Sequence, residues 1–381
     1  MHDEPDAPTL HSTSLTGLAS ASAITRPAGD GALSSGGLRA ALRALRPVVG
    51  ARAAGVAGQA PPLERFAMAG DPPTVSACHM LESGSARAVA LHAEPTVRGF
   101  LDGIQRSRVL GHAAGTPIIF ATVAAAIQRR EARRLSTWNV PLVRHLVLAA
   151  REHVGEPVWE ALEASGVAPI DVADGETLPL HPLAVRARAL ETVAQERETL
   201  ERQLAASWCR DGDGWLWIDG GISGTFAVDE HSPAFGVVKS HSTLYGEPGM
   251  LRTTLALAVG ARSPAFLIRH RARRAVASWY LRLHASPGDD PLHGLVRIEI
   301  APSAALLAQT ERAGFGAATD DATALADPDA PTVRALVRRV DEISTWLLAE
   351  RAPVSLPDPR WHTLTYGVYA CEQFLKALIG A

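Results

Sequence analysis

Hydrophobic positions divide the chain into a weakly patterned beginning and a strongly patterned remainder. Residues 1–73 are rich in Ala, Gly, Ser and Pro, and only Leu38–Arg46 shows a helical period there. From about Thr74 onward, apolar runs alternate with turn residues such as Gly, Pro and Asp. We therefore expect a low-complexity, partly disordered extension over 1–73 and one folded domain over 74–381.

The patterned part predicts strands and helices in an irregular order. Short apolar or alternating runs predict strands at Ala86–Leu91, Val97–Leu101, Pro117–Ala126, Trp215–Ile218, Ala234–Val238, Ala265–Ile268, Ser278–Leu283 and Gly294–Ile300. Other segments predict helices at Val143–His153, Leu183–Trp208, Thr332–Ala349 and Tyr366–Leu378, and a loop at Ala301–Pro331. This order predicts an α/β fold, of the α+β kind, built on one mixed sheet.

Composition and missing motifs exclude several classes of protein. The 381 residues carry a formal net charge of −3, which argues against coating nucleic acid by bulk charge but allows a local basic groove. Three widely separated cysteines argue against a disulfide framework or structural zinc, and favour a cytoplasmic location. No apolar run is long enough to span a membrane, and the acidic start does not resemble a secretory signal. A phosphate-binding Gly-Lys-Ser/Thr loop and a nucleophile elbow are also missing.

Two Asp-Gly pairs follow predicted strands, Asp102-Gly103 after one and Asp219-Gly220 after another. Asp-Gly is a common hairpin turn, which is the simpler interpretation of either pair alone. If the two strands are neighbours, their ends hold two carboxylates at a separation suited to a divalent cation. The residues by themselves leave both interpretations open.

The longest predicted helix carries a third candidate carboxylate. Its apolar stripe contains Leu200 and Leu204, and Glu201 lies at the edge of this stripe, one turn after Arg197. Glu198 points further round the helix. A carboxylate in this position needs a compensating charge, which a salt bridge to Arg197 or a bound metal ion would supply equally well.

Positively charged residues supply candidate nucleic-acid contacts. Lys239, one of only two lysines, ends a predicted strand, where it would meet a phosphate or be solvated. Arg282 and Arg297 lie on strands with a polar face, which would follow a nucleic-acid backbone or be an ordinary exposed face. Arg106 is a further candidate contact. The densest positive run, Arg269–Arg274, is either a binding patch or a solvated loop.

In chain order, these motifs resemble the NurA family of nucleases from about residue 98 to residue 378. The matching segments are Phe100-Leu101-Asp102-Gly103, the helix through Glu198 and Glu201, Trp217-Ile218-Asp219-Gly220, Gly236-Val237-Val238-Lys239, Trp279-Tyr280-Leu281-Arg282-Leu283 and Val296-Arg297-Ile298-Glu299. The resemblance implies an RNase H-like core and a DNA nuclease that works from DNA ends with Mn²⁺ or Mg²⁺. It also implies a homodimer docked to a hexameric HerA- or FtsK-like ATPase in DNA repair or defence.

The resemblance also assigns roles to residues of this chain. The metal ligands it implies are Asp102, Asp219 and a helix glutamate, Glu198 or Glu201. The catalytic group it implies consists of Asp102, Glu201, Asp219, Lys239 and Tyr366, and the implied nucleic-acid contacts are Arg106, Lys239, Arg282 and Arg297.

The C-terminal motif departs from the family pattern. Tyr366 is followed by Gly367 instead of proline, and Phe374 stands where the family has a histidine. A catalytically incomplete NurA-like adaptor that binds an ATPase or DNA is therefore the alternative function. Another RNase H-like activity, such as a structure-specific endonuclease, is a third.

Overall fold

The computed structural model describes residues 72–380 except 91–95, 165, 167, 226, 270–272, 286–289, 313–326 and 328. Its strands are β1 (Thr74–Ser76), β2 (His79–Met80), β3 (Arg87–Ala88), β4 (Val97–Ala113), β5 (Thr116–Glu131), β6 (Arg134–Ala149), β7 (Ile170–Asp171), β8 (Trp215–Asp219), β9 (Ala234–Val238), β10 (Thr243–Tyr245), β11 (Ala261–Arg262), β12 (Phe266–Ile268), β13 (Val276–Arg282) and β14 (Leu295–Ile300). The helices are α3 (Arg151–Val154), α4 (Glu156–Ala164), α5 (Pro182–Asp211), α6 (Pro248–Leu255), α7 (Ala304–Arg312), α8 (Pro331–Glu350), η2 (Trp361–Thr363) and α9 (Tyr366–Ile379).

A twelve-stranded mixed sheet forms the centre of the described part, so the expected mixed α/β fold is confirmed. Its main path runs β2-β12-β13-β14-β9-β8-β4-β5-β6-β7, and β11 joins β13 to β3. In the middle of this path, β4, β8 and β9 are parallel, whereas β4, β5 and β6 are antiparallel. The parallel step from β4 to β8 requires a crossover, and the chain between them contains the 30-residue helix α5.

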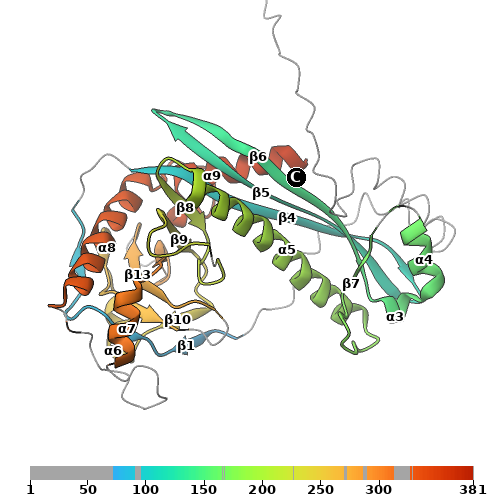
Figure 1. The fold of residues 1–381 in the computed structure, drawn as a ribbon, viewed down its shortest axis with the longest axis horizontal. Helices are drawn as coiled ribbons and strands as arrows, with labels where there is room; N and C mark the ends of the chain where they lie inside the picture. The colour runs from blue at the N-terminus through green and yellow to red at the C-terminus, as the bar shows by residue number, and fades with distance from the viewer. Residues whose placement is uncertain are drawn as a thin grey trace, which may run out of the picture.

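The long strands β4, β5 and β6 make a ribbon that extends well past β8 (Figure 1). The β4–β5 turn is Ala114-Gly115, where both residues have positive φ, 48° and 81°. This is the backbone twist that tight hairpins favour. At the far end of the ribbon, α3 and α4 cover the sheet (Figure 1).

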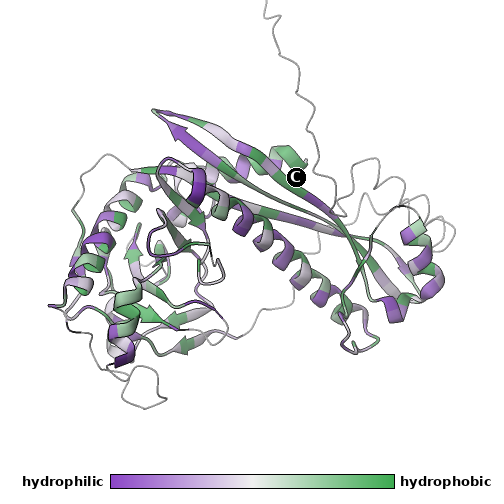
Figure 2. Cartoon of the chain, viewed as in Figure 1, coloured by the Kyte–Doolittle hydropathy of each residue, from purple (hydrophilic) through white to green (hydrophobic). Residues whose placement is uncertain are grey.

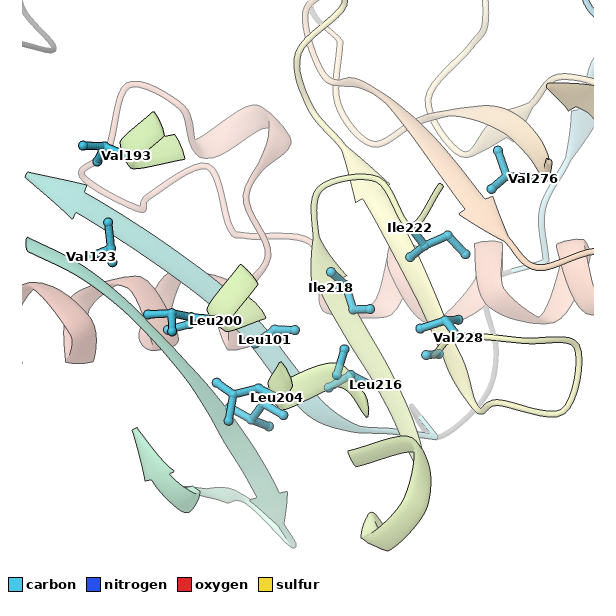
Figure 3. Close-up of a cluster of buried hydrophobic side chains, with 14 of the residues drawn as sticks. Leu101, Val123, Val193, Leu200, Leu204, Leu216, Ile218, Ile222, Val228 and Val276 are labelled. Carbon is cyan, nitrogen blue, oxygen red and sulfur yellow. The ribbon is translucent and has the colours of Figure 1, made fainter. Parts of the chain in front are cut away.

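Helices cover both faces of the central strands. On one face, Leu200 and Leu204 of α5 pack with Leu101 of β4 and Ile218 of β8 (Figure 3). On the other face, α8 and α9 pack on β13, β14, β8 and β4 through apolar side chains. Burial of each such side chain contributes about 1.5–3 kcal/mol to the stability of the fold. Packing on both faces therefore keeps β4 and β8 in register.

Asp102-Gly103 does not form the turn expected at the end of a short strand. β4 continues through it to Ala113, and Asp102 pairs with Ala126 of β5. The outer half of β4 has polar side chains on both faces, so the apolar sequence pattern ends many residues before the backbone hydrogen bonds to β5 end. The second pair behaves as expected, because β8 ends at Asp219 and Gly220 turns away with a φ of 125°.

The helix predicted at Val143–His153 is wrong. Strand β6 runs through Ala149, paired with β5, and only Arg151–Val154 is helical. A short apolar run is compatible with the period of a helix and with that of a strand. Here the segment is a strand because it pairs with β5. The expected loop Ala301–Pro331 likewise contains helix α7.

Most other predicted elements agree with the structure within a few residues, including α5, β8, β9 and α9. Of the strand predicted at Ala86–Leu91, the structure describes residues 86–90, and among these only Arg87–Ala88 forms a strand. The helix predicted at Leu38–Arg46 and the extension to residue 71 lie outside the described residues.

Polar residues gather at the tip of the β5–β6 hairpin (Figure 2). Arg129 and Arg130 near this tip are held by ion pairs to Asp213 and Glu350. Within the described residues, we find no helix that combines the length and the apolar character needed to cross a membrane.

Candidate active site

Parallel pairing of β4 and β8 brings the two Asp-Gly pairs together. Leu101 pairs with Ile218, and the next residues along the two strands are Asp102 and Asp219. Neighbouring strands lie about 4.8 Å apart, so the two aspartates are close in space. β8 ends here while β4 continues, and the carboxylates therefore lie where one strand gives way to an open edge.

Asp102 is the most deeply buried of the candidate carboxylates, with 7% of the residue exposed. It lies on the face of β4 that α9 covers, because it pairs with Ala126, which packs against Cys371 and Leu375. Burial and then the neighbouring Asp219 carboxylate raise the pKa of Asp102 well above its ordinary value, against the opposing charge of Lys239. Its Oδ1 accepts a hydrogen bond of 2.8 Å from the Gly103 amide.

Asp219 is partly exposed at the end of β8 and bonds to Lys239. Both carboxylate oxygens lie 2.8 Å from the lysine Nζ. Lys239 follows β9, which pairs in parallel with β8, so the sheet places the lysine beside the aspartate. The sequence analysis did not anticipate this contact, and the contact of Lys239 with phosphate stays a prediction.

Glu201 approaches from α5, on the opposite face of β4. A Cβ atom at Gly103 would overlap its carboxylate, so the absence of a side chain at Gly103 allows the helix to come this close. Arg197 bonds Glu201 and also donates to Oε1 of Gln105 on β4, at 3.2 Å. The expected ion pair thus exists, and it ties the helix to the strand.

Burial is also the main reason for the altered acidity of Glu201. It raises the pKa to about 7, with further increases from Asp219 and Glu198 and an opposing effect of Arg197. Asp219 therefore raises the pKa of two carboxylates that reach it from opposite faces of the sheet. Buried carboxylates with raised pKa values that lie close together are typical of functional sites, so these residues are the candidate cluster.

A pocket of about 130 Å³ opens between α5 and the end of β8. Acidic and basic side chains both line it: Glu198, Glu201, Asp219, Arg197, Arg202 and Arg273. Asp102 lies behind this pocket, across β4. Carboxylates at the base and guanidinium groups around them match a phosphate ester that is held beside a cation.

Four carboxylates form this cluster: Asp102, Glu198, Glu201 and Asp219. Arg197 and Lys239 bond to them, and Arg202 and Arg273 line the same pocket, so four basic side chains balance the four carboxylates. Carboxylate oxygens are the ligands that Mn²⁺ and Mg²⁺ prefer. In the described part of the chain, no three His, Cys, Asp or Glu residues form a group that could hold a metal ion as they stand. A divalent cation would therefore bind here only if Arg197 and Lys239 released Glu201 and Asp219.

The structure does not bring Tyr366 into this cluster. Tyr366 is 63% exposed at the start of α9, and it is the next residue, Gly367, that packs against Phe100. Arg106 lies further along β4, and its Nη1 donates to the carbonyl of Gly380 at 2.8 Å. The described contacts give these two residues no place beside Asp102.

The exposed polar sheet face expected on β13 and β14 is wrong, because every residue of both strands is buried. Arg282 donates to the carbonyl oxygens of Leu255, Leu257 and His293 at 2.5–3.2 Å, so it joins loops together. Arg269 and Arg274 of the basic run also bond within the protein, and residues 270–272 lie outside the described part.

Glu299 is the supporting residue that the sequence analysis missed. It is 1% exposed, and its Oε2 accepts a hydrogen bond of 2.8 Å from the Ile222 amide, just after Asp219-Gly220. Arg297, expected to contact nucleic acid, instead bonds Glu299 Oε1 at 2.5 Å. The alternation of Arg297 and Glu299 gave a signal for an ion pair, but nothing in the sequence indicated the loop it supports.

We compared the chain with protein-family models and with curated proteins. The sequence matches none of the family models and none of the curated proteins.

Proposed function

We propose that the chain is a metal-dependent DNA nuclease that hydrolyses phosphodiester bonds. The observation that carries this proposal is that Asp102 and Asp219 occupy equivalent positions on neighbouring parallel strands. Glu201 approaches from the opposite face of β4, against Gly103. Three carboxylates from distant parts of the sequence converge, and a bound cation would offset the repulsion between them. The resemblance to NurA nucleases and to an RNase H-like core supplies the class of reaction.

Each charged group has a role in this proposal. Asp102, Asp219 and Glu201 would hold Mn²⁺ or Mg²⁺, with Glu198 as the alternative helix ligand. The bound ion would polarise the scissile phosphate and lower the pKa of an attacking water. Arg202 and Arg273 line the pocket and would hold the phosphate, and Lys239 would offset charge in the transition state once it leaves Asp219.

The finer features of the proposal come from the resemblance alone. They are a preference for DNA ends, a homodimer, a cytoplasmic location and a HerA- or FtsK-like ATPase partner. Exposed Tyr366 and buried Arg282 are not used in the proposed chemistry.

A DNA degradation assay tests the proposal. The purified chain is incubated with linear duplex and with closed circular DNA in Mn²⁺, alongside D102N, D219N and the control D211N, which changes an exposed aspartate at the end of α5. We expect wild type and D211N to degrade linear DNA, and D102N and D219N to lose at least about 100-fold in rate. Full activity of D102N or D219N would reject the assignment, and cleavage of closed circles would reject end dependence.

A second candidate is the catalytically incomplete adaptor. It is favoured by one observation, namely that Lys239 contacts both oxygens of Asp219 and so occupies a metal-ligand position. An adaptor would bind linear DNA or a HerA-like ATPase without degrading DNA in any divalent cation. A DNA-binding assay run beside the degradation assay separates the two candidates, because an adaptor would bind linear DNA while even the wild type degrades none of it.

A further inference from the structure

A second pocket, separate from the candidate active site, lies where the start of α8 meets the segment between β2 and β3. Its volume is about 580 Å³, within the usual range for small-ligand sites. The residues that line it are Glu82, Ser83, Arg87, Asp329, Pro331, Val333, Arg334, Val337 and Arg338. None of them lines the pocket between α5 and β8, so the two sites are distinct.

Three arginines face this pocket from two walls, Arg87 on β3 and both Arg334 and Arg338 on α8. Residues 334 and 338 are one helical turn apart, so their side chains leave α8 on the same side. The first turn of α8 has no side-chain cap, which adds the positive end of a 20-residue helix to the same wall. The concentration of positive charge points to an anionic ligand.

Two acidic residues also line the pocket, Glu82 and the exposed Asp329, and together they offset only part of the charge of the three arginines. Glu82 is buried and already accepts hydrogen bonds from Arg262 Nη1 at 2.7 Å, from Arg262 Nη2 at 3.1 Å and from the Ala265 amide at 3.0 Å. Its remaining contact is with Arg87 Nε, at 3.0 Å. Glu82 therefore anchors Arg87 at the pocket, and because Arg262 also pairs with Asp341 at 2.6 Å, the four groups Glu82, Asp341, Arg87 and Arg262 balance in charge. The charge left for a ligand is that of Arg334 and Arg338 on α8.

The two arginines on α8 keep their charge available. Arg334 bonds the backbone carbonyl of Asp329, which carries no formal charge. Arg338 is exposed and forms neither an ion pair nor a side-chain hydrogen bond with another described residue. Guanidinium groups bind phosphate oxygens through paired N–H donors, so a phosphate between Arg87, Arg334 and Arg338 would satisfy these donors.

From this arrangement we infer that the pocket binds a phosphate monoester of mononucleotide size. The arginines would hold the phosphate, and the apolar side chains of Pro331 and Val337 would contact the nucleoside. A volume of about 580 Å³ is larger than orthophosphate needs, which is why a nucleotide fits better.

Isothermal titration calorimetry in EDTA tests this site, because EDTA removes the cations on which the candidate active site would depend. The ligands are dAMP, orthophosphate and deoxyadenosine, and the proteins are wild type, R334Q/R338Q and R339Q. Arg339 is the matched control because it lies on the same helix but pairs with Glu342 at 2.9 Å and stacks on Trp215. All three changed residues are exposed, and thermal melting verifies folding.

We expect saturable binding of dAMP that is about ten-fold weaker or more in R334Q/R338Q and unchanged in R339Q. Orthophosphate should bind more weakly than dAMP, and deoxyadenosine should not bind. No saturation by dAMP at millimolar concentration, or equal affinity in R334Q/R338Q and R339Q, would overturn the inference. Orthophosphate binding as tightly as dAMP would overturn the nucleotide size. Since DNA degradation is not measured, failure here leaves the proposed nuclease unaffected.

Discussion

Asp102 directly follows Leu101, and Asp219 directly follows Ile218, the residue that pairs with Leu101. The strand pairing alone therefore fixes how far apart the two aspartates lie. A parallel register shifted by one residue would turn one carboxylate to the opposite face of the sheet. The register is held by apolar contacts on both faces, among them Leu101 and Ile218 against α5 and Phe100 and Trp217 against the other face. The candidate site thus depends on strand pairing that is held by fully buried side chains on both faces of the sheet.

Metal binding should stabilise the folded protein through these two aspartates. A ligand present at 100 times its Kd adds about 2.7 kcal/mol to the free energy of unfolding. We therefore expect millimolar Mn²⁺ to raise the Tm of wild type and of D211N, and to leave the Tm of D102N and D219N nearly unchanged. Differential scanning fluorimetry with and without Mn²⁺ measures this, and an equal rise in all four proteins would contradict it.

The raised pKa of Glu201 predicts a specific pH dependence of stability. The pKa is about 7 in the folded protein and 4.5 for an ordinary solvated glutamate, so the folded state holds this proton more tightly. The free energy of unfolding contributed by Glu201 therefore falls as pH rises from about 4.5 to about 7. E201Q should gain stability relative to wild type between pH 5 and pH 8.

Urea denaturation at pH 5 and pH 8 in EDTA checks this prediction. The control is E191Q, which changes an exposed glutamate of α5 that pairs with Arg188. For E191Q, the difference from wild type should be the same at both pH values. A pH-independent difference for E201Q as well would show that ionised Glu201 costs the fold nothing.

Gly103 should not tolerate alanine, because the added Cβ would overlap the Glu201 carboxylate. We expect G103A to lose about 1–3 kcal/mol of stability as α5 is pushed from β4, and to lose nuclease activity with it. The control is G249A, since Gly249 on α6 has open space around its Cβ position and no positive φ. Chemical denaturation and the DNA assay measure both effects. Wild-type stability of G103A would show that Glu201 moves aside freely.

Glu299 and Arg297 should show strong coupling. E299Q leaves the buried Arg297 guanidinium without its charged partner, which typically costs about 3–5 kcal/mol. The double variant R297Q/E299Q removes both charges, and we expect it to be more stable than E299Q. A double-mutant cycle by urea denaturation gives the coupling energy. Simple additivity would mean that the pair does not support the loop after Asp219.

Much of this fold was readable from local pattern. The long helix α5, the strands β8 and β9 and the final helix α9 were predicted within a few residues, because each has a clear apolar period or run. Strand β6 and the outer half of β4 were missed, because their pairing with β5 outweighs a weak local signal. Arg282 and Arg297 were expected to be exposed, since alternation reveals two faces without revealing that both are covered.

Charged residues next to apolar runs are visible in the sequence alone, and they include Asp102, Glu201, Asp219 and Lys239. Their proximity is visible only in the folded chain, because it depends on the parallel pairing of β4 with β8 and on the close approach of α5 at Gly103. The tertiary structure alone also revealed the arginine pocket at α8, whose walls are more than 240 residues apart along the chain. Local patterns follow from the chemistry of neighbouring residues, whereas a site depends on contacts between distant ones, which arise only when the whole core packs.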